Sequence, residues 1–200
     1  SDMIKRVAES SFNAITVDGD TSTNDTFLAF SSGPKLDQKY LPILEEGLHL
    51  TAQYLAKAIA RDGEGANCLL EIKVEGASSD LDAHMIARTI ASSSLVKTAV
   101  HGSDPNWGRI IAALGRAGSF FNLNDVKLWI GPYEIFADGR PLDFDRQLVS
   151  NFMKARLKGK YLIDDLISIR LRIGVGNYSA TAWGCDLSDQ YVRINADYTT

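Results

Sequence analysis

The sequence predicts a mixed α/β or α+β protein, and two kinds of hydrophobic periodicity carry this prediction. From Leu36 to Arg61, apolar residues recur at helical spacing and form one stripe between Leu41 and Ile59. In Leu69 to Val74 and in Leu166 to Ile173, apolar and polar residues alternate, as they do in half-buried strands. Because several strands alternate in this way, a fully buried parallel sheet is not expected.

The first forty residues are predicted to contain one helix and two short strands. Apolar residues at helical spacing from Ser1 to Phe12 predict an opening helix with Ser1 or Asp2 as its cap. Ala14 to Val17 and Thr26 to Phe30 are predicted strands. The segment between them, Asp18 to Asp25, is rich in side chains that hydrogen-bond nearby backbone, so we expect a polar loop.

The longest helix is expected from Leu36 to Arg61, with Pro42 in its first turn. It ends at Asp62-Gly-Glu-Gly-Ala66, since glycine there permits the backbone that closes a helix. After the strand Leu69 to Val74, a Ser-Ser-Asp cap predicts a helix from Leu81 to Ser92. Ser94 to Gly108 contains a proline and two glycines, so we expect a loop there.

The second half of the chain is predicted to alternate helices with strands and to end in strands. A hairpin is expected to turn at Gly131-Pro132. The predicted helices are Trp107 to Ala117 and Phe144 to Leu157. The predicted strands are Lys127 to Ile130, Glu134 to Ala137, Leu166 to Ile173, Ser179 to Gly184 and Tyr191 to Asn195. We interpret residues 1–200 as one portion of a larger subunit. The sequence does not decide whether this portion forms one domain or two subdomains with a boundary near residues 94–110.

Composition narrows the classes of function. A formal net charge of -4 argues against nucleic acid as a partner, because phosphate-binding proteins gather a basic excess. No stretch approaches the roughly 18 to 20 apolar residues that span a bilayer, and the start lacks a signal-peptide pattern. Cys68 and Cys185 lack the spacing of metal ligands, so we expect two buried free thiols in a reducing compartment.

The acidic loop from Asp18 to Asp25 has three interpretations. Its oxygen-rich side chains could bind a divalent cation, but the calcium-loop pattern fails at Thr23 and Ala29. Asp18 and Asp20 also resemble the nucleophile motif of Mg²⁺-dependent phosphatases, with Asp164-Asp165 as a later acidic pair. A structural turn, in which the polar side chains satisfy the loop backbone, is the preferred interpretation.

Two further motifs combine chemistry-bearing residues with glycine. Glu64, between two glycines, could bind a cationic amine, although a simple helix ending explains the glycines equally well. The stretch from His101 to Arg109 contains parts of a catalytic triad, but no G-x-S-x-G motif accompanies it. His101 is therefore expected to be a hydrogen-bonding loop residue, and Trp107 a core residue. Ser1 could be an N-terminal nucleophile, but this is the weaker interpretation.

Four stretches together resemble the ornithine acetyltransferase family, also called glutamate N-acetyltransferases, which acts in arginine biosynthesis. They are Ser11 to Asp25, Asp62 to Ala66, Leu95 to Arg109 and Gly184 to Thr200. The resemblance implies a layered sandwich of sheets and helices that is similar to N-terminal-nucleophile hydrolases but connected differently. It also implies a precursor that cleaves itself before a threonine, which then acts as nucleophile. Nothing before Ser11 matches that cleavage site, so no catalytic residue is assigned within this chain.

The same resemblance assigns three substrate-binding residues, Glu64, Asn195 and Thr200. It implies acetyl transfer from N-acetylornithine to glutamate without a metal or other cofactor, and leaves open whether acetyl-CoA is a co-substrate. The family's oxyanion-hole residues belong to an α-subunit, and the implied assembly is a heterotetramer of two α and two β chains. The expected location is the cytoplasm, or an organelle in a eukaryote. The alternatives are a phosphohydrolase that uses Asp18 and Asp20 and a non-catalytic partner chain.

Overall fold

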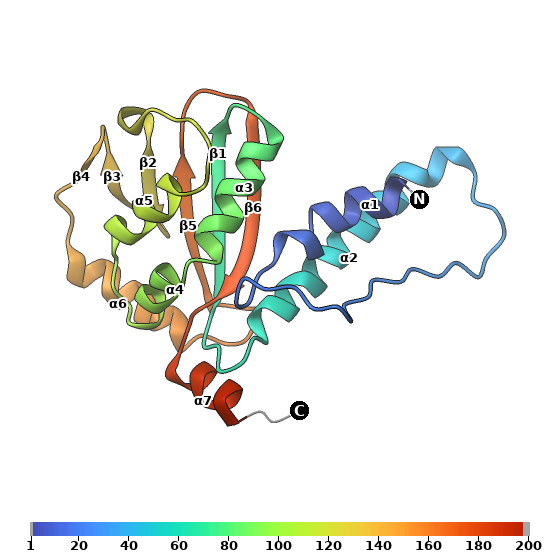
Figure 1. Cartoon of the computed structure of the whole chain (residues 1–200). Helices are drawn as coiled ribbons and strands as arrows, with labels where there is room; N and C mark the ends of the chain where they lie inside the picture. The colour runs from blue at the N-terminus through green and yellow to red at the C-terminus, as the bar shows by residue number, and fades with distance from the viewer. Residues whose placement is uncertain (1, 198–200) are drawn as a thin grey trace.

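The structure, a computed structural model, describes residues 2–197 and arranges them around one mixed sheet of six strands (Figure 1). The strand order across the sheet is β4-β3-β2-β5-β1-β6. β1 and β5 pair in parallel, and the other pairs are antiparallel. The strands are β1 Leu69–Ala77, β2 Lys127–Ile130, β3 Tyr133–Ala137, β4 Arg140–Pro141, β5 Leu166–Arg172 and β6 Tyr178–Cys185. The predicted mixed α/β class is confirmed.

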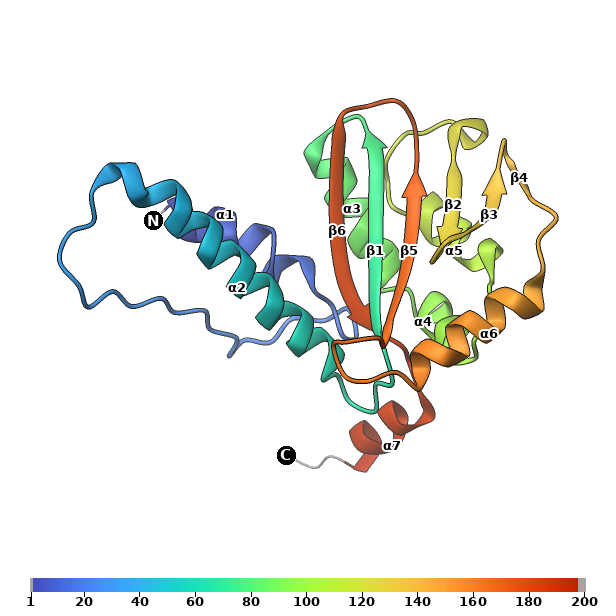
Figure 2. The same ribbon diagram turned by 180° about the vertical axis from the view of Figure 1, so that it is seen from behind.

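Helices cover one face of this sheet. The α-helices among residues 2–197 are α1 Asp2–Glu9, α2 Leu41–Arg61, α3 Asp80–Ala91, α4 Ser94–His101, α5 Trp107–Gly115, α6 Arg146–Leu157 and α7 Asp189–Asp197. Short 3₁₀ turns occupy Phe12–Ala14, Gln38–Tyr40 and Leu123–Asp125. Figure 1 shows α3, α4 and α5 in front of the strands, and Figure 2 shows the opposite face with no helix across its centre. This chain therefore covers one face with helices and the other face only in part, where Ala60 of α2 packs with Leu69 and Trp183.

The hydrophobic core lies between the sheet and these helices. In the parallel strands β1 and β5, alternate side chains point into this core, with Ile72 of β1 beside Ile169 of β5. They join α3 residues such as Ile86 and Ile90 in one continuous cluster. Burying side chains of this size stabilises the fold by about 1.5–3 kcal/mol each. The alternation seen in the sequence is thus explained by a sheet with two different faces.

The second face of the sheet carries polar and charged side chains. Glu71 of β1 is buried there and accepts a hydrogen bond from Trp183 Nε1 at 3.0 Å. The guanidinium of Arg170 lies 4.1 Å from the ring centroid of Trp129, a cation–π geometry. These interactions give Glu71 and Arg170 partners on this face of β1 and β5.

Two predictions, one in the middle of the chain and one near its C-terminus, are wrong. Ser94 to Gly108 was expected to be a loop, but its first half is α4, because Val96 and Val100 pack into the core at helical spacing. Tyr191 to Asn195 was expected to be a strand and lies within α7. No strand in the described chain pairs with this segment. Its alternating pattern of apolar and polar residues therefore does not produce a strand.

The predicted strand Thr26 to Phe30 is also wrong, since the segment is irregular and exposed. The predicted strand Ala14 to Val17 is wrong as well, since Phe12–Ala14 is a 3₁₀ turn and Ile15 makes only an isolated bridge to Trp183. The remaining predicted elements are confirmed with small shifts of their ends. The hairpin turns at Gly131, whose φ of 55° favours glycine.

Helix α2 projects away from the sheet, with α1 packed along its first half (Figures 1 and 2). Arg6 of α1 makes a two-pronged ion pair with Glu45 of α2, at 2.6 and 2.8 Å. Although α2 is the longest helix, no helix among residues 2–197 is long and apolar enough to cross a membrane.

The predicted apolar stripe of α2 is only partly buried: Ala52 lies on the buried face, whereas Leu41, Leu44, Leu55 and Ile59 are exposed. The side chains that α2 buries are the alanines Ala52, Ala56 and Ala60. Except for the partly buried Leu48, its large apolar side chains are at least 38% exposed: Leu41, Ile43, Leu44, Leu50, Tyr54, Leu55 and Ile59. We call these seven residues the exposed apolar face of α2. An isolated chain rarely presents so many large apolar side chains on one helix.

Candidate functional site

The loop between α2 and β1, residues 62–67, presents Glu64 to solvent. It closes α2 as predicted, since the Asp62 N–H still donates to the helix carbonyls of Ala58 and Ile59. Its glycines allow close packing on neighbouring backbone. A Cβ at Gly65, where φ is +67°, would lie 2.6 Å from Gln190 Cβ at the start of α7. We call residues 62–67 the Glu64 loop.

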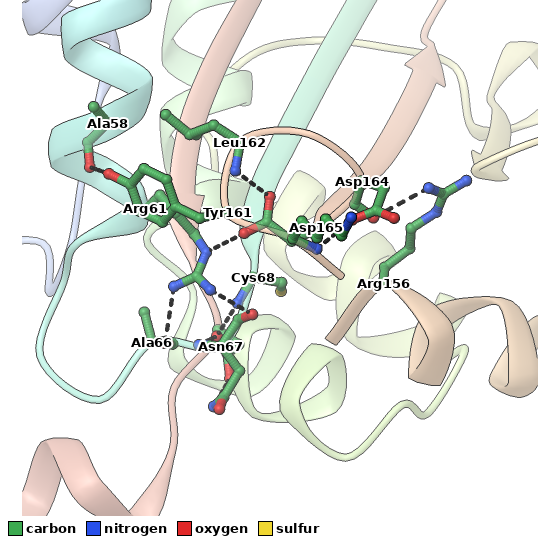
Figure 3. Close-up of polar contacts among 12 residues, drawn as sticks. Ala58, Arg61, Ala66, Asn67, Cys68, Arg156, Tyr161, Leu162, Asp164 and Asp165 are labelled. Carbon is green, nitrogen blue, oxygen red and sulfur yellow. Dashed lines mark hydrogen bonds and ion pairs between the residues drawn. The ribbon is translucent and has the colours of Figure 1, made fainter. Parts of the chain in front are cut away.

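Arg61, the last residue of α2, holds one side of this loop (Figure 3). Its Nε donates to Asp165 Oδ2 at 2.5 Å, and its two terminal nitrogens donate to the carbonyls of Ala66 and Asn67 at 2.9 Å each. Asp165 is itself buried and accepts a hydrogen bond from the Leu162 N–H at 2.9 Å. The guanidinium thus connects the Glu64 loop to the entry of β5.

Asp186, directly after β6, holds the other side. Its Oδ1 accepts from the backbone N–H groups of Asn67 and Cys68, at 2.6 and 3.0 Å. Its Oδ2 lies 2.9 Å from the Asn67 side-chain nitrogen and 2.8 Å from His101 Nδ1. The Asp186 side chain is completely buried, and each of its carboxylate oxygens has two hydrogen-bond partners in the protein.

The hydrogen bonds to Asp186 decide its charge state. Burial by itself would raise the pKa of this carboxyl, but the bonds from Asn67, His101 and Cys68 outweigh it and lower the pKa below its usual value. Asp186 is accordingly ionised at neutral pH. The nearby thiols behave oppositely, because burial raises the pKa of both Cys68 and Cys185. Both are free and buried, as predicted, and neither is a ready nucleophile.

Two residues of helix α4 contact Asp186 and its neighbour Cys185. His101, at its last position, provides the 2.8 Å contact to Asp186, and buried Lys97 donates to the Cys185 carbonyl at 2.6 Å. The hydrogen-bonding role predicted for His101 is confirmed, but it is exerted from a helix end. Trp107 packs against the core as predicted, with its ring centroid 5.6 Å from that of Phe136.

Helix α7 begins against the Glu64 loop and carries Asn195. Ser188 Oγ, just before the helix, donates to the Gly65 carbonyl at 2.7 Å. The Asn195 amide donates to the Tyr191 carbonyl of the same helix at 3.0 Å. The structure therefore brings the helix that bears Asn195 to the Glu64 loop. Thr200, the third predicted substrate residue, lies outside the described residues.

The bulky side chains of α7 make few tertiary contacts that could anchor the C-terminal segment. Val192 and Ile194 are 62% and 47% exposed. Tyr191 does make a tertiary contact, since its hydroxyl donates to Asp18 Oδ2 at 3.3 Å. Tyr198 lies outside the described residues.

The acidic loop from Asp18 to Asp25 has the local hydrogen bonds that a structural turn requires. Asp18 Oδ1 accepts from the Asp20 N–H at 3.0 Å, and Ser22 Oγ accepts from the Asn24 N–H at 3.1 Å. Among residues 2–197, no group of three or more His, Cys, Asp or Glu side chains could hold a metal ion. Asp165, considered for a phosphatase site, is the ion-pair partner of Arg61. Ser1 lies outside the described residues.

Arg61, Asp165 and Asp186 were not predicted to belong to the site. Asp186 lies within the C-terminal stretch that carries the family resemblance, and a carboxylate directly after a buried strand was its only signal. Arg61 and Asp165 are separated by 104 positions, so no local pattern joins them.

Comparisons with known proteins agree over the whole chain. The model of the ArgJ family matches residues 1–200. A protein from a strain of Prochlorococcus marinus, named arginine biosynthesis bifunctional protein ArgJ, is 90% identical over 100% of this chain and 48% of its own length. One of the same name from a strain of Synechocystis is 51% identical over 99% of this chain and 49% of its own length. The chain thus spans about half the length of the curated relatives it matches.

A solved structure has the same fold. It is the crystal structure of arginine biosynthesis bifunctional protein argJ from Bacillus halodurans, with 39% sequence identity and a TM-score of 0.90. The match covers 98% of this chain and 92% of that chain.

Proposed function

The chain belongs to the ArgJ family, and from this premise we propose that it is part of a glutamate N-acetyltransferase of arginine biosynthesis. The proposed reaction moves an acetyl group from N-acetylornithine to glutamate through an acetyl-threonine on a residue outside this chain. The observation that carries the proposal is the family match over all 200 residues. The named relatives act in arginine biosynthesis by their printed names, and the acetyl transfer follows from the family resemblance in the sequence.

The reaction divides into two acyl transfers. The threonine hydroxyl attacks the acetyl carbonyl, the carbon–nitrogen bond to ornithine breaks, and ornithine leaves with the proton. The glutamate amine then attacks the acetyl-threonine, which restores the hydroxyl. Neither step requires a metal or other cofactor, and acetyl-CoA could replace N-acetylornithine as donor.

Glu64 is the residue here that fits the substrate best. Its side chain is exposed and ends in a carboxylate, which suits an ammonium group. Asn195 and Thr200 are proposed to bind other polar groups of the amino acid. For Asn195, this requires its amide to leave the Tyr191 carbonyl or to use its second N–H.

The proposed partners are the α-subunit and the preceding part of the same precursor, released by autocatalytic cleavage. The exposed apolar face of α2 supports this assembly, because seven large side chains on one helix gain stability when another surface covers them. The chain also spans only about half of its relatives. We propose a heterotetramer of two α and two β chains in the bacterial cytoplasm.

The test is reconstitution. Residues 1–200 alone should show no acetyl transfer, and production with the upstream half of the gene should give transfer from N-acetylornithine to glutamate with ping-pong kinetics. Activity should survive dialysis against a chelator. Robust transfer by the isolated chain would place the nucleophile within it, and phosphatase activity that needs Mg²⁺ would favour the alternative built on Asp18 and Asp20.

A further inference from the structure

We propose that Arg61 and Asp186 are positioning residues that fix the Glu64 loop in the conformation that presents Glu64 to the substrate's amino group. The inference rests on the proposed function, because it assumes that Glu64 binds substrate. It assigns a role to two charged residues that touch the loop backbone and leave the Glu64 side chain free.

The two residues bind opposite kinds of backbone group in the loop and in the residue that follows it: Arg61 binds carbonyls, and Asp186 binds N–H groups. Arg61 donates to the carbonyls of Ala66 and Asn67, while Asp186 accepts from the N–H groups of Asn67 and Cys68. Asn67 is thus bound at its N–H by an anion and at its carbonyl by a cation. Such charge-assisted bonds are shorter and stronger than neutral ones, so they fix the path of the backbone.

Ser188 also holds the loop, since its Oγ donates to the Gly65 carbonyl at 2.7 Å, but the loop's own residues give it little rigidity. Gly63 and Gly65 contribute no side chains, and glycine has the largest backbone freedom to lose on ordering. The Glu64 side chain itself is exposed. External anchors must therefore define where its carboxylate lies, and Arg61 and Asp186 anchor the segment that follows it.

The burial of the anchors indicates a geometric role. The side chains of Arg61, Asp165 and Asp186 are 14%, 1% and 0% exposed. Taking charges out of water is costly, and apolar residues of similar size often give equal or greater stability. What apolar residues cannot supply is directional bonding to both sides of one peptide unit. Fixed geometry is thus the advantage that the charged residues provide here.

A double-mutant cycle on the reconstituted complex tests the proposal. The variants are Asp186→Asn, Glu64→Gln and their combination, with kcat and KM measured for glutamate and N-acetylornithine. Glu71→Gln is the matched control. Glu71 is also a buried carboxylate of the sheet region, and its partners Trp183, Ser168 and Lys73 are all in the sheet.

If Asp186 acts through Glu64, Asp186→Asn should lower kcat/KM by roughly 10- to 100-fold, chiefly by raising KM. In the Glu64→Gln background, the same change should cost less than about 3-fold, because the interaction that it supports is already lost. Glu71→Gln should show equal effects in both backgrounds. Equal losses from Asp186→Asn in both backgrounds would overturn the positioning role and leave the proposed function intact.

A second variant and a measurement that does not depend on activity keep the proposal testable if Asp186→Asn folds poorly or if the wild-type complex is inactive. Arg61→Lys keeps the charge but cannot bridge Asp165 and two carbonyls, so it should repeat the KM effect more mildly. Hydrogen–deuterium exchange over residues 62–68 should be at least about 10-fold faster in Asp186→Asn and unchanged in Glu71→Gln. Unchanged exchange in Asp186→Asn would overturn the positioning role. Inactive wild-type complex would reject the function that the inference requires, whatever the exchange rates.

Discussion

At the scale of single residues, the charge of Glu64 is the feature most open to test. Glu64→Gln keeps the shape of the side chain but removes the anion that is proposed to bind the substrate's ammonium. We expect kcat/KM of the reconstituted complex to fall roughly 5- to 150-fold, as for an unpaired polar partner. Glu75→Gln, the same substitution near the opposite end of β1, should leave the steady-state kinetics unchanged. Wild-type kinetics for Glu64→Gln would remove this residue from the site.

Asp186 gives a pH dependence of stability whose sign follows from its lowered pKa. Because the folded pKa lies below the unfolded one, the ionised carboxylate stabilises the fold above pH about 4, and this stabilisation disappears as the pH falls through the folded pKa. Asp186→Asn should therefore unfold more easily at pH 7, by about 1–3 kcal/mol. It should also lose less stability than the wild type between pH 5 and pH 3. Thermal unfolding followed by circular dichroism measures both, and parallel acid curves would contradict the assignment.

At the scale of elements, the contact between the Glu64 loop and α7 depends on a missing side chain. Gly65→Ala places a Cβ 2.6 Å from Gln190 Cβ and 2.7 Å from Ser188 Oγ, in a backbone conformation that alanine disfavours. We expect a loss of about 1–3 kcal/mol of unfolding free energy and displacement of α7. Gly47→Ala in mid-α2, where a Cβ meets nothing within 4 Å, should stabilise by about 0.5–1 kcal/mol. Equal melting temperatures for the two variants would contradict this account.

The sequence predicts most elements because local periodicity and capping specify them. The cap of α3, for example, is Ser79, whose side chain accepts from the Asp82 N–H as the Ser-Ser-Asp motif suggests. The failures have a common physical origin. α4 is helical because its apolar residues meet the sheet, and residues 26–30 are irregular because no strand lies beside them. Both outcomes depend on tertiary neighbours, which a local pattern does not contain.

At the scale of the whole molecule, the site is only partly contained in the sequence pattern. Glu64 could be proposed from the sequence because its two glycines and its resemblance to a known motif lie within five residues. The anchors of its loop could not be found, since Asn67 and Asp186 are 119 positions apart. Only the sheet, which places the start of β1 beside the end of β6, brings them together.

The exposed apolar face of α2 makes a prediction about assembly. Leu50 and Tyr54 are each 62% exposed, so replacing both with Asn should change the stability of the isolated chain by less than about 1 kcal/mol. The same double variant should weaken association with the upstream half by about 2 kcal/mol or more, measured by co-purification and titration calorimetry. Leu81→Asn with Val175→Asn, at positions 70% and 92% exposed, is the control and should leave association unchanged. Full association of the α2 variant would place the partner elsewhere.

The same helix surface has a consequence for how the protein is supplied in the cell. A chain synthesised in excess of its partner would present seven large apolar side chains to chaperones and proteases, as misfolded proteins do. Translation of both halves as the proposed precursor would avoid this surplus, because each ribosome would release them in equal number and at the same place. Cleavage after folding would then separate two pieces whose apolar surfaces had already met, so the cell never has to match two independent expression levels.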